Sequence, residues 1–256
     1  MNDNLYMRKI FCILLATAIL ASCKKDETLR YNNMTMGNIQ GNEIISDQGN
    51  IFIIKESLFN VDLSSFESKR VMLSCDVLRE SAERTYDIRL TGITGVLTKN
   101  VKTISDSTPA EDLHVNNPFV IKEIWYSGGY LNMAIETAHK TGSETPHYIN
   151  LVHEPSEGEG SAYTLILRHN AQGEVPTEED SDFYGAVGYV SFPISRYIKE
   201  DSAKIILKWN SHKFTGNGYS LIESEDQSKE FNWERKGFEQ TPGRSITPNL
   251  KQRNYL

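Results

Sequence analysis

The sequence has three cysteines, and we expect none of them to form a disulfide within the mature chain. Cys12 lies in an apolar N-terminal segment that we expect to be removed, and Cys23 follows that segment directly. If Cys23 carries a lipid, Cys75 is the only thiol left, so the fold must be stabilised by its core. The sequence also lacks a CxxC pair, which excludes a structural zinc site built on thiolates.

The apolar run near the N-terminus is too short for a transmembrane helix. A spanning helix needs roughly 20 apolar residues, whereas this run covers Ile10–Ala21. Arg8 and Lys9 precede it, as in a secretion signal. The run ends in Leu-Ala-Ser-Cys, which matches the bacterial lipobox. We therefore predict a signal peptide at residues 1–22, cleavage before Cys23, and membrane attachment through a diacylglycerol on its thiol.

The chain has no excess of basic residues. Its formal net charge is −7, and removal of Asp3, Arg8 and Lys9 with the signal peptide makes the mature chain −8. Such a chain is a poor nucleic-acid binder, because neutralising phosphates requires a basic face. Directly after Cys23 comes Lys-Lys-Asp-Glu. This segment fits two interpretations, a surface-export signal of outer-membrane lipoproteins or a solvated tether.

Alternation of apolar and polar residues predicts a first domain of about five strands. Val71, Leu73, Cys75 and Val77 alternate with Met72, Ser74 and Asp76, and a second alternating run covers residues 86–90. We assign residues 23–33 to a lipidated tether and residues 34–115 to a small OB-like β-barrel.

After a stretch rich in Ser, Thr, Asp and Pro at residues 105–118, the two-residue period resumes. The strands that flank Ser127-Gly128-Gly129 are expected to form one hairpin, and those that flank the loop 154–161 are expected to form a second pair. One short helix is expected at residues 195–201. Residues 116–210 therefore predict a β-sandwich. Residues 211–256 predict an irregular tail that is partly disordered, with strand addition by residues 231–238 as the alternative.

Several runs resemble the NigD-like family of Bacteroidetes lipoproteins in their order and spacing. In the first domain they are residues 71–76, 86–90 and 96–99, and in the second they are residues 130–133, 165–170 and 190–194. The resemblance covers about residues 31–209 and implies an N-terminal OB-like barrel with a C-terminal β-sandwich. It implies a cell-envelope protein related by name to bacteriocin immunity, without a defined activity.

Histidines and acidic residues are the candidate metal ligands of this sequence. His147 and His153 share one strand face by parity, and His139 and His169 could approach them across a hairpin. None of the spacings is that of a zinc motif, so we expect sheet histidines that hydrogen-bond to neighbours, and no metal site. An acidic loop covers residues 170–183, and its carboxylates lack the spacing of an EF-hand, which favours a solvated loop over calcium binding. These carboxylates are Glu178, Glu179, Asp180 and Asp182.

The sequence predicts no catalytic residues and no cofactor. It contains no GxSxG, and its Gly-rich segments are too short for a phosphate loop. Trp125, Tyr126 and Tyr130 surround the Gly128-Gly129 turn and are candidates for stacking on a sugar or a partner side chain, although packing between strands is the simpler interpretation. We therefore expect a non-enzymatic envelope lipoprotein that binds a protein or peptide, with an immunity-like role. The alternative is a surface carbohydrate-binding module or a glycan-acting enzyme.

Overall fold

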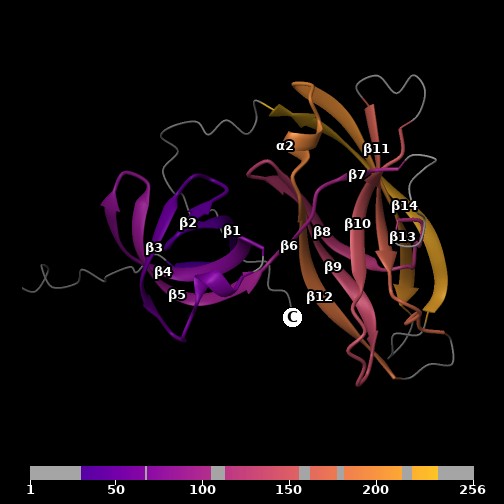
Figure 1. Cartoon of the computed structure of the whole chain (residues 1–256), viewed down its shortest axis with the longest axis horizontal. Helices are drawn as coiled ribbons and strands as arrows, with labels where there is room; N and C mark the ends of the chain where they lie inside the picture. The colour runs from indigo at the N-terminus through magenta and orange to yellow at the C-terminus, as the bar shows by residue number, and fades with distance from the viewer. Residues whose placement is uncertain are drawn as a thin grey trace, which may run out of the picture.

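The computed structural model describes residues 30–66, 68–104, 113–155, 162–177, 182–214 and 221–235. In this part of the chain, two β domains lie side by side (Figure 1). The first is a closed barrel in the strand order β1-β2-β3-β5-β4. Neighbouring strands are antiparallel except β3 and β5, which are parallel. This is the topology of an OB-fold, as predicted. The barrel strands are β1 (Arg30–Gln40), β2 (Glu43–Ser46), β3 (Ile51–Ser57), β4 (Arg70–Ala82) and β5 (Thr85–Gly95).

The barrel core comes from the alternating residues of β4 and β5. Val71, Leu73 and Cys75 of β4 pack with Ile88 and Leu90 of β5 in one buried cluster. Because successive side chains of a strand point to opposite faces, each strand supplies one row of apolar residues to the barrel interior and one row to the barrel exterior. Between β3 and β4, the one-turn 3-10 helix η1 (Leu63–Ser65) begins after Asp62, whose carboxylate accepts a hydrogen bond from the Ser64 amide at 2.9 Å.

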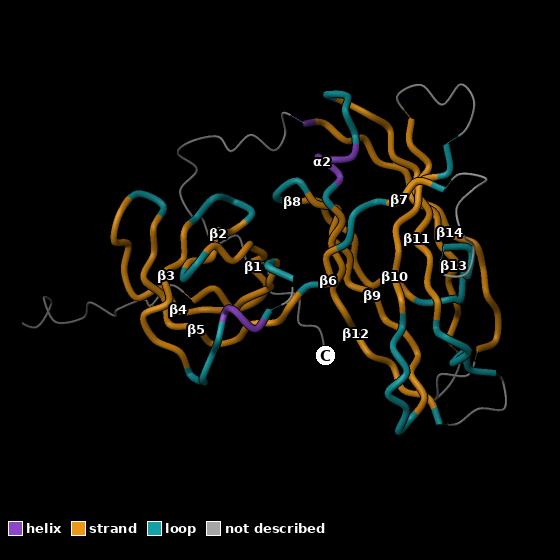
Figure 2. Tube along the Cα trace, in the orientation of Figure 1, coloured by secondary structure: helices purple, strands orange, loops and turns teal. Residues whose placement is uncertain are grey.

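The second domain is a sandwich of two sheets, in the strand orders β14-β13-β11-β10-β7 and β6-β12-β9-β8. Figure 2 shows how these long strands dominate the domain. A single apolar cluster fills the space between the sheets, including Met133, Leu151, Leu165, Phe192 and Leu207. The strands are β6 (Leu97–Thr98), β7 (Lys102–Thr103), β8 (Val120–Ser127), β9 (Tyr130–Lys140), β10 (Tyr148–His153), β11 (Ala162–Asn170), β12 (Phe183–Phe192), β13 (Ser202–Phe214) and β14 (Leu221–Glu234).

The sandwich takes up residues that the sequence analysis assigned to its neighbours. The short strands β6 and β7 lie within the predicted barrel segment, yet they pair in parallel with β12 and β10. The reason is that the barrel already closes through the pairing of β1 with β4, which leaves residues after Gly95 free to pair elsewhere. Much of the predicted boundary stretch, residues 105–112, lies outside the described residues.

The tail prediction is wrong for residues 211–214 and 221–234. Strand β14 pairs with β13 in an antiparallel register from Ser202↔Glu234 to Phe214↔Leu221. The physical reason is the burial of Trp233, which is 2% exposed and packs in the sandwich core with Phe231 beside it. Strand addition, the alternative for residues 231–238, is therefore what the structure shows for residues 231–234, and it extends back to Leu221. Residues 236–256 lie outside the described part.

The predicted short helix is present as one turn, α2 (Ile194–Tyr197), with Ile194 buried in the core. It is shorter than the predicted segment 195–201, because the backbone is extended again at Ile198. Among the described residues, no helix has the length and apolar character needed to cross a membrane.

Candidate functional site

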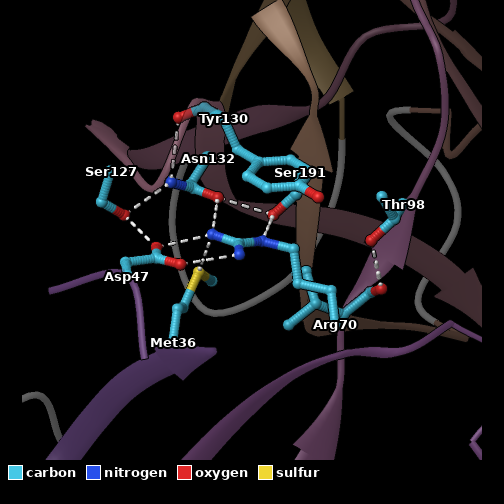
Figure 3. Close-up of polar contacts among 9 residues, drawn as sticks. Met36, Asp47, Arg70, Thr98, Ser127, Tyr130, Asn132 and Ser191 are labelled. Carbon is cyan, nitrogen blue, oxygen red and sulfur yellow. Dashed lines mark hydrogen bonds and ion pairs between the residues drawn. The ribbon is translucent and has the colours of Figure 1, made fainter. Parts of the chain in front are cut away.

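A buried polar network joins the barrel to the sandwich (Figure 3). At its centre is Arg70, the first residue of β4, which is 1% exposed. Its guanidinium donates two hydrogen bonds to the Asp47 carboxylate, at 2.8 and 2.7 Å. It also donates to Asn132 Oδ1 at 2.9 Å and to Ser191 Oγ at 3.0 Å, and lies 4.0 Å from the centroid of the Tyr130 ring. Arg70 and Asp47 belong to the barrel, whereas the other three partners belong to the sandwich.

The turn between β2 and β3 positions Asp47 for this network. The Ser127 hydroxyl of the β8–β9 turn hydrogen-bonds to the Asp47 carboxylate, and Asn132 Nδ2 donates to that hydroxyl at 3.0 Å. Gly128 has φ +57°, and a Cβ at this position would collide with Asp47. A glycine is thus needed here both for the backbone conformation and for the close approach of the carboxylate.

The aromatic candidates from the sequence lie in this junction and in the sandwich core. Trp125 packs against the buried barrel cluster of Met36 and Met72. Tyr130 is the ring beneath the Arg70 guanidinium. Tyr126 packs on the sandwich core, where burial raises the pKa of its hydroxyl despite hydrogen bonding with Trp233 and Ser195. Their faces are therefore used for contacts within the chain.

A second polar cluster lies at the opposite end of the sandwich sheets and consists of His139, His147, His169 and Glu174. His139 comes from β9, His147 from the residue before β10, and His169 from β11. The rings of His139 and His147 are stacked, with centroids 4.0 Å apart and planes at 14°. His147 Nε2 lies 3.5 Å from Glu174 Oε2, and its Nδ1 lies 3.1 Å from His169 Nε2.

The turn after β11 delivers the carboxylate to this cluster. Asn170 Oδ1 accepts a hydrogen bond from the Gln172 amide at 2.9 Å, and Gln172 and Gly173 both have positive φ. The Glu174 amide then donates to the Ala171 carbonyl at 2.9 Å, which closes the turn. As a result Glu174 faces the connection between β9 and β10.

The surroundings of the cluster favour neutral imidazoles at His147 and His169 and an ionised carboxylate at Glu174. Burial lowers the pKa of His169 to about 4, with a further lowering from His147. Burial also lowers the pKa of His147, with His139 acting in the same direction and Glu174 opposing. Hydrogen bonding from Ser143 lowers the pKa of Glu174 to about 2. The cluster thus presents imidazole lone pairs beside a negative charge near neutral pH.

The structure separates some residues that the sequence analysis grouped. His153 lies at the far end of β10 from His147, where its ring contacts Tyr163 and Tyr197. Of the acidic candidates, Glu178, Glu179 and Asp180 lie outside the described residues. Asp182 precedes β12, and its carbonyl accepts from the Thr141 amide. Glu174 was not singled out from the sequence, and its only signal is its place after an Asn-Ala-Gln-Gly turn.

Of Cys75 and Cys23, the structure describes Cys75 alone. Cys75 is buried in the barrel core, and burial beside Asp76 raises the pKa of its thiol to about 12. It is therefore a packing residue without thiolate character at neutral pH. Cys23 lies outside the described residues, so its lipidation stays a prediction.

Comparison with known proteins identifies the second domain. Residues 100–221 match the family of the NigD-like C-terminal beta sandwich domain. No curated protein matches the sequence. The resemblance to NigD-like proteins that the sequence predicted is thereby confirmed.

Solved structures share the fold of both domains. A NigD-like immunity protein from Bacteroides caccae has a TM-score of 0.59 and 20% identity, covering 79% of this chain and 96% of that one. A protein of unknown function from Bacteroides vulgatus has a TM-score of 0.59 and 19% identity, covering 84% and 96%. A candidate lipoprotein from Bacteroides fragilis has a TM-score of 0.52 and 12% identity, covering 77% and 96%. At these identities the comparison establishes the fold.

Proposed function

We propose that this chain, whose residues 100–221 match the NigD-like C-terminal beta sandwich domain, is a lipid-anchored binding protein of the bacterial cell envelope with an immunity-like role. The observation that carries the proposal is the two-domain architecture shared with the immunity protein of Bacteroides caccae, nearly all of which is covered. The lipobox ending at Cys23 supports the envelope location. The partner in this proposal is a secreted protein or peptide.

The junction between the domains supports a binding role, because it fixes one composite surface. Arg70 and Asp47 are both nearly inaccessible to solvent, and their hydrogen bonds cross from barrel to sandwich. A surface that is already ordered loses less entropy on association than one that must be ordered by its partner. This rigidity favours recognition of a folded or extended partner on the outer faces.

The end of the barrel near η1 offers the contact surface that best suits such a partner. Leu58 and Phe59, directly after β3, are 69% and 40% exposed. The same segment continues into Val61 and Leu63, which line a hollow of about 650 Å³ together with Ile54 and residues of neighbouring elements. Exposed apolar side chains beside a hollow of this size are typical of interaction sites.

The immunity-like role is tested by survival. A Bacteroides strain that lacks the gene is complemented with the whole chain and challenged with antibacterial proteins and peptides secreted by related strains. We expect the complemented strain to survive at least one preparation that kills the parent. Equal killing of both strains by every active preparation would contradict the immunity role.

Two variants separate the anchor from the contact surface. Cys23→Ser should lose membrane attachment and appear as a soluble or uncleaved protein, because the lipid supplies the membrane affinity.

Leu58→Ser with Phe59→Ser should abolish protection while the protein remains in the membrane fraction. Leu78→Ser is the matched control, since Leu78 is another exposed apolar residue of the barrel, at 37%. Loss of protection in the control alone would place the contact elsewhere.

A further inference from the structure

We propose that His139, His147 and Glu174 bind a divalent transition-metal ion, with zinc the best match to this donor set. One ligand atom from each residue lies within 4.8 Å of the other two. Two imidazoles and one carboxylate are a donor set that zinc takes in proteins, where a fourth position remains for water or another ligand. This inference departs from the expectation of no metal site, although the histidines do hydrogen-bond to neighbours as expected, and it is independent of the immunity-like role.

The spacing of the two innermost ligand atoms suits a bound ion better than a hydrogen bond. His147 Nε2 and Glu174 Oε2 are 3.5 Å apart, which exceeds the range of about 2.7–3.2 Å for N–H···O bonds. In a tetrahedral zinc site with bonds of about 2.0–2.1 Å, two ligand atoms lie about 3.3 Å apart. The His147 side chain is 5% exposed, so this nitrogen depends on partners that the protein or a bound ion supplies rather than on water.

Each proposed ligand is held by an outer hydrogen-bond partner. Thr137 Oγ1 lies 2.9 Å from His139 Nε2, which leaves Nδ1 of that ring to face the ion. His169 Nε2 lies 3.1 Å from His147 Nδ1, which leaves Nε2 of His147 as the ligand. The Ser143 hydroxyl donates to Glu174 Oε1, which leaves Oε2 on the inner side. Such partners fix the tautomer and orientation of metal ligands, and their loss typically weakens metal binding.

The three proposed ligands come from three separate segments of the sandwich, so a bound ion would connect these segments. His139 ends the outward course of β9, His147 begins the return along β10, and Glu174 comes from the loop between β11 and β12. A bound ion would connect three segments that otherwise meet through a few hydrogen bonds. Metal binding to the folded state alone should therefore raise the unfolding midpoint.

The test is titration of the purified whole chain, stripped with EDTA, with Zn²⁺ and separately with Co²⁺. We expect one saturable equivalent by calorimetry, a raised unfolding midpoint, and the visible absorption bands of tetrahedral Co²⁺ without a thiolate charge-transfer band. His147→Gln and Glu174→Gln should each weaken binding by about 100-fold or more. His169→Gln should weaken it by about 10- to 100-fold, since it removes an outer partner.

His114→Gln is the matched control, because His114 is an exposed histidine outside the cluster, and it should bind as the unaltered chain does. Circular dichroism of the metal-free variants checks that each is folded. The proposal is overturned if the unaltered chain binds no single equivalent and gives no tetrahedral Co²⁺ spectrum. It is also overturned if folded His147→Gln and Glu174→Gln proteins bind zinc as tightly as the His114→Gln control.

Discussion

At the scale of single residues, Arg70 carries a charge into a place that water does not reach. The bidentate contact with Asp47 and the bonds to Asn132 and Ser191 satisfy its guanidinium. Such a buried pair adds little net stability compared with apolar residues of the same shape. Removing one partner is costly, because the other charge stays buried alone.

Arg70→Met should therefore lower the free energy of unfolding by about 3–5 kcal/mol, as measured by denaturant titration. Arg70→Met combined with Asp47→Leu should recover part of this loss, because no lone charge remains. Lys204→Met removes an ion pair with Glu230 in which both side chains are about half exposed, and it should change stability by less than about 1 kcal/mol. Equal losses in the free energy of unfolding for Arg70→Met and Lys204→Met would contradict the expectation that leaving Asp47 buried without its partner is costly.

Titration of the buried histidines predicts how stability depends on pH. The pKa values of His169 and His212 are both lowered to about 4, in each case chiefly by burial. Between pH 6.5 and 4 the unfolded chain therefore binds protons that the folded chain does not, so stability falls as the pH falls. For His169 the loss by pH 4 is about 3 kcal/mol at most. Above pH 6.5 these groups contribute no pH dependence.

The check is unfolding by denaturant at pH 7, 5 and 4 in EDTA, for the unaltered chain and for His169→Gln. Glutamine cannot be protonated in this range, so the variant should lose less stability on acidification. Parallel curves for the two proteins would contradict the assignment of this pH dependence to His169.

The histidine cluster also shows what the sequence could not reveal at this scale. His139 and His147 flank the connection between β9 and β10, which belong to different sheets, and could be suspected of approaching each other. Glu174 joins them only because the turn at Gln172 and Gly173 reverses the chain after β11. No fixed spacing encodes such a meeting, whereas zinc motifs within one helix or knuckle can be read from sequence.

At the scale of elements, predictability follows the amphipathic pattern. Strands β4 and β5 could be predicted because a closed barrel requires a regular inward apolar row. Strand β14 could not, because Phe231 and Trp233 reach the apolar cluster but the positions before them in the core-facing row, Glu225, Gln227 and Lys229, are polar. Its strand conformation depends on pairing with β13, which is information from outside the segment.

Strand β14 should be indispensable for the sandwich. A chain that ends at Asn210 loses β14 and the last four residues of β13, exposes the edge of the shortened β13 and removes Trp233 from the core. It should melt many degrees below a chain that ends at Arg235, or be insoluble. Trp233→Ala alone should cost about 3–5 kcal/mol, whereas Glu230→Ala on the exposed side of the strand should cost under about 1 kcal/mol. Equal midpoints for the two shortened chains would contradict this role.

At the scale of the whole molecule, the two domains should unfold as one unit. Besides the Arg70 network, the junction contains an apolar layer in which Trp125 and Tyr189 of the sandwich pack on Met36 and Met72 of the barrel. Unfolding of either domain would remove this apolar layer and leave the Arg70 charge without its partners. The other domain would thereby lose stability, so the unfolding transitions of the two domains should coincide. Calorimetry should therefore show one transition, with a calorimetric enthalpy equal to the van't Hoff enthalpy.

Breaking the junction from the sandwich side should separate the transitions without damage to either core. Trp125→Ala with Asn132→Ala removes groups that reach the barrel but leaves Arg70 paired with Asp47. We expect the ratio of calorimetric to van't Hoff enthalpy to rise above one, or two transitions to be resolved. Trp233→Ala weakens the sandwich core away from the barrel, so it should lower the midpoint and keep a single transition. Two transitions in the unaltered chain, or one transition in the junction variant, would show that the buried contacts between the domains do not couple their unfolding.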